Sequence, residues 1–451
     1  MASLAHSLAR HVYRSRPEDI PLDVRHEAAR ALLNWFGCAL GGSTADLLGR
    51  ALTVADRLSG PRNATVLGRN KRLDIANAAF INCLSSSLHA FDDTHLVSIA
   101  HPTGPVAASL LAISETRCVS GLEFAHALIL GIEVECRMGC VLMEPPGDCS
   151  VAWTMTGLVG GIGAAAAVSK LLGLDEVSTM HALGIAATQA GGFREGLGTM
   201  TRDLPMAQAA RSGVIGALLA AEGFSTSETN LDGPKGFAHV FAHTPNLPAA
   251  TRDLGQRFEL MNNSYKPYPC GIVIHPALDV CLEIARSNQY EPEDIASVDL
   301  RVHPDAIIVT GLKEPHDGLS AQVSLYHWVA AALVRRRGGL EETSDAAAYD
   351  PLIKTIRQRV KAEADKNFGR DGARAEVRLR DGRVLTASVE HCRGSAARPL
   401  TDDELQEKLL MQAHGVIGDA PVRDIAKLCW TLENVADVGA DVRRLFPAEM
   451  E

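Results

Sequence analysis

The chain has 451 residues, of which 46% are hydrophobic and 22% charged, and its formal net charge is −10. One hydrophobic core rarely serves a chain of this length, so we expect two domains. The acidic balance argues against a nucleic-acid partner, because binding phosphates needs a basic face. An anionic substrate would need a pocket that is locally positive.

The composition also bounds the cellular setting. No apolar run is long and unbroken enough to predict a membrane partner, since glycines and polar groups interrupt the richest segment, residues 150–174. Ten scattered cysteines without a CxxC pair are typical of reduced thiols in an intracellular protein. We expect a cytoplasmic protein. A mitochondrial presequence is the alternative, because the first seventeen residues hold three arginines and no acid, but an amphipathic helix with Leu4, Leu8 and Val12 on one stripe is favoured.

The first 260 residues predict helices nearly throughout. Residues 26–40 have apolar side chains at helical spacing, and Gly41-Gly42 predicts the end of this helix. Pro105 lies in a suitable first-turn position for the next helix. Further helices rich in alanine, glycine and serine are expected at residues 121–142, 174–192 and 203–224. Such small residues let helices pack closely.

The pattern changes after Pro267. Residues 297–304 alternate and predict a strand, and residues 375–391 predict a hairpin with its turn at Asp381-Gly382. The stretches between them, residues 323–336 and 350–365, predict helices, and helices return at residues 401–416 and 420–435. The predicted fold class is therefore mainly α. An all-helical domain (residues 1–264 and 398–451) would carry an inserted α+β lid domain (residues 265–397).

The segment HAFDDTHLVSIAHPTGP, residues 89–105, places three histidines and two aspartates beside an apolar run. Charges there cost free energy unless they pair, bind a ligand or do chemistry. The histidines are six residues apart, which does not put two ligands on one helix face, so no metal site is predicted. An Asp–His couple could serve as a general acid or base. The structural alternative is that Asp93 and Thr94 cap a helix or brace a turn, with His101 held against the chain before Pro102.

Two other segments supply positive groups. Residues 191–205 place Arg194 and Arg202 beside glycines ahead of a helix start, where backbone N–H groups favour a carboxylate. Residues 264–279 place Lys266 before a proline-bounded turn and His275 near another helix start. Each motif is weak alone. Together they would provide cations and imidazoles for a site between two domains.

Several of these motifs occur together in one known family. NWFGCALGG, DDTH…HPTGPV, GTMTRDLPMAQAARSG, SYKPYPC and the DGRV hairpin resemble the MmgE/PrpD family essentially from end to end. The family includes 2-methylcitrate dehydratases, cis-aconitate decarboxylase and iminodisuccinate epimerase. The resemblance implies a helical body, a smaller α+β lid, a homodimer, and a cleft site without an obligatory metal or organic cofactor.

The resemblance also suggests site residues. As catalytic residues we expect His101, oriented by Asp93, together with His275 and Tyr326. The register of His275 leaves a second possibility, in which Gly271 occupies the family's histidine position. As substrate-binding residues we expect Thr94, Arg202, Lys266 and Thr154.

Four positions depart from the family pattern. Ala90 stands where an aspartate is usual, Thr154 and Pro205 replace histidines, and Arg202 replaces a lysine. An arginine can bind a carboxylate through two hydrogen bonds but does not readily donate a proton. These changes weigh against cis-aconitate decarboxylation and weaken the case for 2-methylcitrate dehydration.

The predicted function is that of a cofactor-independent lyase of the hydro-lyase type. It would remove a proton next to a carboxylate of a citrate-like di- or tricarboxylic acid. The alternatives are an epimerase or isomerase of a dicarboxylate such as iminodisuccinate, or a decarboxylase of the cis-aconitate type. A non-catalytic helical dimer that binds a carboxylate is the alternative from another class.

Overall fold

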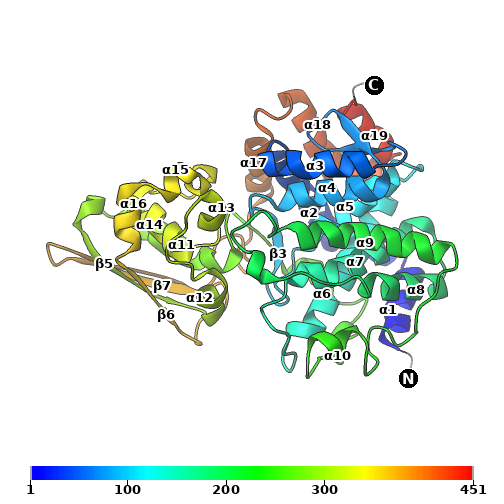
Figure 1. The fold of residues 1–451 in the computed structure, drawn as a ribbon, viewed down its shortest axis with the longest axis horizontal. Coiled ribbons are helices and arrows are strands. Elements are labelled where there is room, and N and C mark those ends of the chain that lie inside the picture. The colour runs from blue at the N-terminus through cyan, green and yellow to red at the C-terminus, as the bar shows by residue number, and fades with distance from the viewer. Residues whose placement is uncertain (1–2, 449–451) are drawn as a thin grey trace.

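The computed structural model describes residues 3–448, and these form two hydrophobic cores (Figure 1). The larger core draws on residues 4–265 and 400–446, and we call this part the helical body. The smaller core and the side chains packed on it lie within residues 268–389, apart from Leu96, and we call this part the smaller lobe. The chain is mainly helical, so the predicted class is confirmed at that level.

The helical body is a stack of helices from both ends of the chain. They are α1 (Leu4–Arg14), α2 (Leu22–Ser43), α3 (Asp46–Leu58), α4 (Ile75–Ser87), α5 (Thr103–Ser114), α6 (Gly121–Met143), α7 (Met155–Leu172), α8 (Glu176–Ala187), α9 (Leu204–Ala221), α10 (Phe237–Phe241), α17 (Asp402–Ala413), α18 (Asp419–Trp430) and α19 (Val438–Leu445). Every residue of α5 is buried, and α7 is buried almost throughout. Their small side chains let neighbouring backbones approach closely.

The predicted end of α2 at Gly41-Gly42 is confirmed to within one residue, since the helix ends at Ser43. The same glycines also serve packing. A β-carbon on Gly42 would lie 2.0 Å from the main-chain oxygen of Ser85 in α4. Gly37 and Gly41 would place theirs 3.1 to 3.2 Å from atoms of α17. These glycines therefore permit close contact between helices.

Two body helices are long and apolar enough to cross a membrane by length and composition alone. Helix α7 is 89% buried over its apolar window, which is the environment of a core helix. Helix α9 is 56% buried, with Leu204 and Leu219 exposed on its outer side. At the N-terminus, α1 buries Leu4, Leu8 and Val12, which confirms the predicted amphipathic helix.

The smaller lobe contains one mixed sheet. Its strand order is β6 (Val360–Ala364), β5 (Ile295–Val302), β7 (Ala373–Leu379), β8 (Val384–Val389), and only the β5–β6 pair is parallel. The helices of this lobe are α11 (His275–Ser287), α12 (Pro304–Thr310), α13 (Gly318–Ala321), α14 (Leu325–Arg335), α15 (Asp345–Ala348) and α16 (Pro351–Arg357). The predicted strand and hairpin are confirmed, and Val298, Leu300 and Val302 are buried together.

The helix expected over residues 350–365 is wrong in its second half. Helix α16 ends at Arg357, and Val360–Ala364 instead form the edge strand β6. Its sequence VKAEA alternates weakly, so periodicity alone did not separate it from the helix before it. Pairing with β5 satisfies its backbone groups and decides the outcome.

Four short strands were not predicted within the region expected to be helical. β1 (Ala64–Val66) and β2 (Lys71–Leu73) form a small hairpin. β3 (Asp93–His95) pairs antiparallel with β4 (Asn263–Tyr265), at the point where the chain leaves the helical body. This second pair joins the histidine-rich segment to the lysine segment, which lies 170 residues later in sequence.

Candidate active site

The register of β3 and β4 creates an ion pair just beyond the paired residues. Asp93 lies opposite Tyr265, so the next residues outward, Asp92 and Lys266, emerge side by side. The Nζ atom of Lys266 lies 2.5 Å from Oδ1 of Asp92, and both side chains are buried. A buried ammonium is tolerated because this carboxylate compensates its charge.

A tight turn after β3 brings His101 back beside the same pair. The main-chain N–H of His95 donates to the oxygen of Ala100, and Ile99 adopts a left-handed conformation with φ of 56°. The main-chain N–H of His101 donates to the hydroxyl of Thr156, at the start of α7, at 2.8 Å. The imidazole is thereby held at the junction of three segments.

The hydrogen bonds of His101 define its tautomer. Its Nδ1 atom lies 2.7 Å from the main-chain oxygen of Asp93, which can only accept, so Nδ1 carries the proton. The Thr94 hydroxyl (3.1 Å) and Oδ2 of Asp92 (3.4 Å) also lie near Nδ1. Among residues 3–448 no hydrogen bond reaches Nε2, which therefore keeps a free lone pair when the ring is neutral.

Burial lowers the pKa of His101 to about 4, although the charge of Asp92 opposes this shift. The imidazole is therefore neutral near neutral pH. Burial by itself raises the pKa of Asp92, but the charges of Lys266 and Arg202, and that of His101 when it is protonated, outweigh burial and hold the pKa of this carboxyl below its ordinary value. Asp92 and His101 thus combine an ionised carboxylate with an uncharged imidazole, which suits the imidazole to accepting a proton.

Asp93 does not face His101 through its carboxylate, as the sequence had suggested. That carboxylate accepts from the Thr103 hydroxyl at 2.5 Å and from the Asn263 side-chain amide at 2.6 Å. Burial raises its pKa. Asp93 holds the imidazole through its main-chain oxygen, and the carboxylate beside the ring belongs to Asp92, which the sequence analysis had not chosen.

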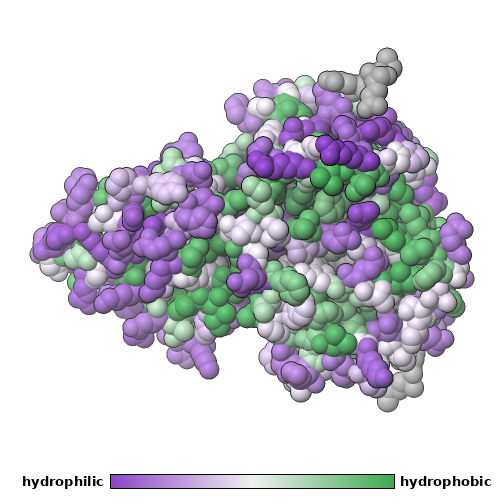
Figure 2. Space-filling model, viewed as in Figure 1, coloured by the Kyte–Doolittle hydropathy of each residue, from purple (hydrophilic) through white to green (hydrophobic). Residues whose placement is uncertain are grey.

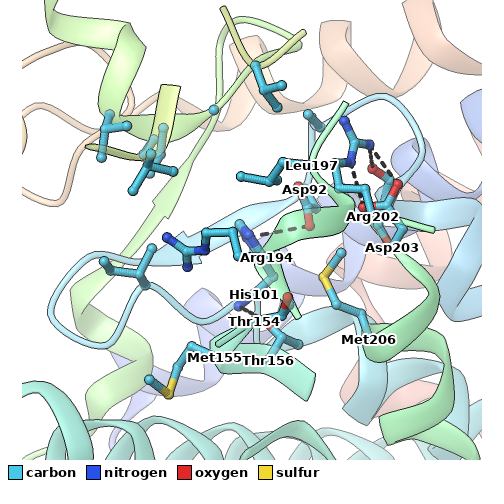
Figure 3. Close-up of a pocket in the computed structure, with 18 of the residues that line it drawn as sticks. Asp92, His101, Thr154, Met155, Thr156, Arg194, Leu197, Arg202, Asp203 and Met206 are labelled. Atoms are coloured by element: carbon cyan, nitrogen blue, oxygen red, sulfur yellow. Dashed lines mark hydrogen bonds and ion pairs between the residues drawn. The ribbon is translucent and has the colours of Figure 1, made fainter. Parts of the chain in front are cut away.

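A cavity of about 780 Å³, its open mouth included, lies between the helical body and the smaller lobe (Figure 3). Asp92, His101 and Lys266 line it, together with Thr154 and Thr156 at the start of α7. Most of the remaining wall is hydrophobic. The cavity is therefore a mixed environment, with one polar corner built on the β3–β4 junction.

Two arginines line the cavity, and they differ in their partners. Arg202 makes two hydrogen bonds to the Asp203 carboxylate, at 2.7 and 2.8 Å, and also donates to Gln322 and to main-chain oxygens. It was expected to hold a substrate carboxylate, but its guanidinium is already occupied. Arg194 forms no side-chain hydrogen bond or ion pair within residues 3–448, and its Nη1 atom is buried without a partner.

Thr154 lines the cavity and the Thr94 hydroxyl contacts the His101 ring, whereas two other predicted residues do neither. His275 is completely buried in the smaller lobe beside the ring of Tyr268, and Gly271 faces the cavity instead. Burial lowers the pKa of His275 to about 3. Tyr326 belongs to the smaller core, with Lys313 over its ring at 5.6 Å. A catalytic role for either residue is not supported by these positions.

The three histidines of residues 89–105 lie in different environments, and only His101 lines the cavity. His89 contacts the main-chain oxygen of Gly41, and His95 is fully buried between Ser98 and Glu259. Within the described residues, one group of potential metal ligands gathers away from the cavity: His95, Cys140 and Glu259. Its carboxylate already pairs with Arg257 at 2.6 Å. We assign this group to internal packing.

A buried lysine from the C-terminal part of the chain supports the segment next to Asp92. The Nζ atom of Lys408, in α17, donates at 2.7 Å to the main-chain oxygen of Phe91 and at 2.7 Å to Oδ1 of Asn34. It also lies 4.2 Å from the centre of the Phe91 ring. Burial lowers its pKa to about 8. Position 90, beside this support, is alanine with φ of 51° and lines the cavity.

Comparison with known proteins agrees with this architecture. The model of the MmgE/PrpD N-terminal domain matches residues 6–249, and that of the MmgE/PrpD C-terminal domain matches residues 268–432. The chain belongs to the MmgE/PrpD family. Strand β4 lies between the two matched regions, and both regions contribute lining residues, so the cavity of this MmgE/PrpD protein lies where its two family domains meet.

Relatives resemble this MmgE/PrpD chain over almost its whole length. The cis-aconitate decarboxylase-like protein oryM of Aspergillus oryzae is 30% identical, over 96% of this chain and 95% of its own. The cis-aconitate decarboxylase of Homo sapiens is 26% identical, over 97% and 93%. The enzyme of that name from Aspergillus terreus is 24% identical, over 93% and 91%.

Proposed function

We propose that the protein is a lyase that abstracts a proton next to a carboxylate of a small di- or tricarboxylic acid, with His101 as the general base. One observation carries the proposal. The imidazole is uncharged near neutral pH, its Nδ1 proton is committed to the Asp93 oxygen, and its Nε2 has no protein partner beside a cavity that holds cations. An oriented neutral imidazole is the commonest general base in enzymes.

Dehydration of a β-hydroxy acid is the first candidate reaction. Nε2 of His101 takes the proton from the carbon next to the carboxylate, and negative charge develops on that carboxylate. The ammonium of Lys266 stabilises it. The electron pair then forms the carbon–carbon double bond as the β-hydroxyl leaves. The imidazolium returns the proton to this hydroxyl, which departs as water, so His101 ends neutral. The step needs no metal or organic cofactor.

The other residues of the polar corner have supporting roles in this proposal. Asp92 balances the charge of Lys266 and stabilises the imidazolium that forms transiently. Asp93 fixes the ring through its main-chain oxygen. The hydroxyls of Thr94, Thr154 and Thr156 are placed to hydrogen-bond the ring or the substrate.

Decarboxylation is the second candidate, and the names of the relatives favour it. In that reaction the bond to one carboxylate breaks, carbon dioxide leaves, and the electron pair is delocalised into an unsaturated carboxylate. A protonated His101 would then donate a proton to the carbon. This route needs the imidazolium at the outset, and the low pKa of the free site disfavours it. Bound carboxylates would have to raise that pKa.

The test is to follow a panel of hydroxy and unsaturated di- and tricarboxylic acids by NMR in D₂O. A new alkene indicates dehydration, carbon dioxide indicates decarboxylation, and deuterium uptake without either indicates epimerisation of an iminodisuccinate-type acid. Binding without exchange would support the non-catalytic alternative. His101→Asn keeps a donor for the Asp93 oxygen but removes the base, so it should abolish the reaction. The exposed His239→Asn is the matched control. Activity of His101→Asn within about tenfold of the parent would contradict the proposal.

We also propose that two copies of the chain associate through the outer side of α9. Leu204 and Leu219 are exposed near opposite ends of α9, Ile308 is exposed on α12, and Figure 2 shows hydrophobic residues interspersed with polar ones on this face. Large exposed apolar surfaces commonly mark protein interfaces. Light scattering after size-exclusion chromatography should give twice the mass of the chain. Leu219→Glu should lower the measured mass to that of one chain.

A further inference from the structure

The charges around the cavity leave one positive group without a partner. Arg202 pairs with Asp203, and Lys266 pairs with Asp92, so each of these cations is already compensated by a carboxylate. Arg194 is not. Figure 3 shows Arg202 turned towards Asp203, whereas Arg194 extends away from that pair. Arg194 is therefore the lining cation that can bind a carboxylate without giving up a carboxylate partner, and Lys266 would have to share its charge between Asp92 and a ligand.

Arg194 is placed to receive a carboxylate. It begins the short turn Arg194–Gly196 in the loop between α8 and α9, and its main-chain N–H donates to Ala152 at 2.8 Å, which fixes the start of the side chain. The guanidinium lines the cavity, and burial lowers its pKa. A half-buried guanidinium without a partner is costly, and a carboxylate that accepts two parallel hydrogen bonds relieves this cost.

The lining residues that the smaller lobe contributes form an apolar wall. Ile272 and Val273 precede α11, Val309 lies in α12, and Val323 precedes α14. Within residues 3–448 the lobe contributes no cation to the lining, and its one lining hydroxyl, that of Thr310, donates to the main-chain oxygen of Ala306. A further carboxylate placed against this wall would be desolvated without compensation, whereas a hydrocarbon group would be stabilised.

From these observations we infer the substrate class. The cavity selects a dicarboxylic acid that carries a short alkyl substituent, rather than a tricarboxylic acid. One carboxylate pairs with Arg194, the other lies at the Lys266 corner next to His101, and the alkyl group packs on the wall of Ile272, Val273, Val309 and Val323. The inference rests on the proposed function for the assignment of the reacting corner, and it narrows the acids on which that reaction acts.

The test measures binding of saturated acids that cannot react, by calorimetry near neutral pH. The probes are succinate, 2-methylsuccinate, 2-propylsuccinate and the tricarboxylate tricarballylate. Affinity should rise about fourfold for each added methylene, the value expected for burying one such group. Tricarballylate should bind at least tenfold more weakly than 2-propylsuccinate. Equal or tighter binding of tricarballylate, or no binding of any of these acids at millimolar concentration, would overturn the inference.

Two variants separate the two parts of the site. Arg194→Gln should weaken the binding of all four acids at least tenfold, but the gain in affinity per added methylene should remain. Val309→Thr, which keeps the shape of the side chain, should reduce that gain and leave succinate unchanged. The exposed Arg444→Gln is the control for Arg194→Gln and should change nothing. If Arg194→Gln binds as the parent does while its circular dichroism is unchanged, the inference is wrong.

The binding experiment is independent of turnover. If His101→Asn stays active while the alkyl preference holds, the proposed function fails and the binding inference stands. If His101→Asn is inactive but tricarballylate binds best, the proposed function stands and the substrate inference fails.

Discussion

The carboxylate of Asp92 lies 2.5 Å from the ammonium of Lys266, one residue beyond the last paired residues of β3 and β4. A shift of one strand by one residue would turn its side chains to the opposite face and separate the pair. The ladder has three residue pairs, so it holds this relationship with few contacts of its own. The buried Asn263–Asp93 hydrogen bond at 2.6 Å reinforces the register.

Asp92→Asn should destabilise the protein by about 3–5 kcal/mol, because it leaves the buried ammonium of Lys266 without a counter-charge. The double variant Asp92→Asn with Lys266→Met should recover part of this loss, since the uncompensated charge is gone. Glu433→Gln removes a partner from the more exposed Arg25–Glu433 pair and should cost less than about 1 kcal/mol. Urea unfolding measures all three. Equal losses from Asp92→Asn and Glu433→Gln would show that the buried pair has no special weight.

The pH dependence of kcat/KM should report His101 in the free protein. A base must be neutral, so activity should be constant from neutral pH down to about pH 5. It should then fall tenfold per pH unit below the pKa of about 4. Asp92→Asn should move this acidic limb to lower pH, because the Asp92 charge raises the pKa of His101. If activity instead rises as the pH falls towards 4, His101 acts as an acid, and the decarboxylation route gains support.

His275→Leu should keep activity within about threefold, because His275 does not line the cavity. It should change the free energy of unfolding by less than about 1.5 kcal/mol near neutral pH, because a fully buried neutral ring is replaced by an apolar side chain of similar size. Burial depresses its pKa from 6.5 to about 3, so its neutral form favours folding above pH 6.5, and this contribution is lost as the pH falls towards 3. His275→Leu should therefore flatten the loss of stability across that window in urea unfolding.

Tyr326→Phe serves as its companion, because Tyr326 also lies in the smaller core. Its kcat should stay within about twofold of the parent. If kcat falls a hundredfold or more in His275→Leu or Tyr326→Phe, the substituted residue takes part in the reaction.

Gly42→Ala should destabilise the protein by about 3 kcal/mol, because the new methyl group would lie 2.0 Å from the main-chain oxygen of Ser85. Gly49→Ala is the matched control within a helix. It meets no atom within 4 Å, so it should stabilise the protein by about 0.5–1 kcal/mol through helix propensity. Thermal unfolding followed by circular dichroism distinguishes them. A harmless Gly42→Ala would mean that α2 and α4 are packed less closely than the structure shows.

Much of the fold could be predicted from periodicity. The long helices α5, α6 and α9, the strand β5 and the Asp381-Gly382 hairpin carry strong local signals. Gly41-Gly42 marked the end of α2 to within one residue, but the contact of Gly42 with α4 carries no local signal and could not be predicted. The strands β3 and β4 were missed because each has three residues and its partner lies far away in sequence. No local pattern specifies such a pair.

The site could be predicted only in part, because local motifs indicate which residues are polar but not which of them meet. His101 and Lys266 could be chosen from their motifs, and the structure brings them to one cavity. Which of two adjacent aspartates faces the imidazole depends on the strand register, so Asp93 was preferred over Asp92. Arg194 and Arg202 have similar sequence surroundings, and only the structure shows that one of them has a carboxylate partner. Asp203 occupies one guanidinium and leaves the other open.

The hydrogen bond from Lys408 to the Phe91 oxygen has a consequence for the synthesis of the chain. Every residue that lines the cavity has left the ribosome once Val323 has emerged, yet α17 follows about eighty residues later. Until then the carbonyl next to Asp92 lacks its buried ammonium, and α2 lacks the helix that packs on Gly37 and Gly41. A nascent chain released before residue 402 would therefore contain the complete set of reacting groups and still be inactive.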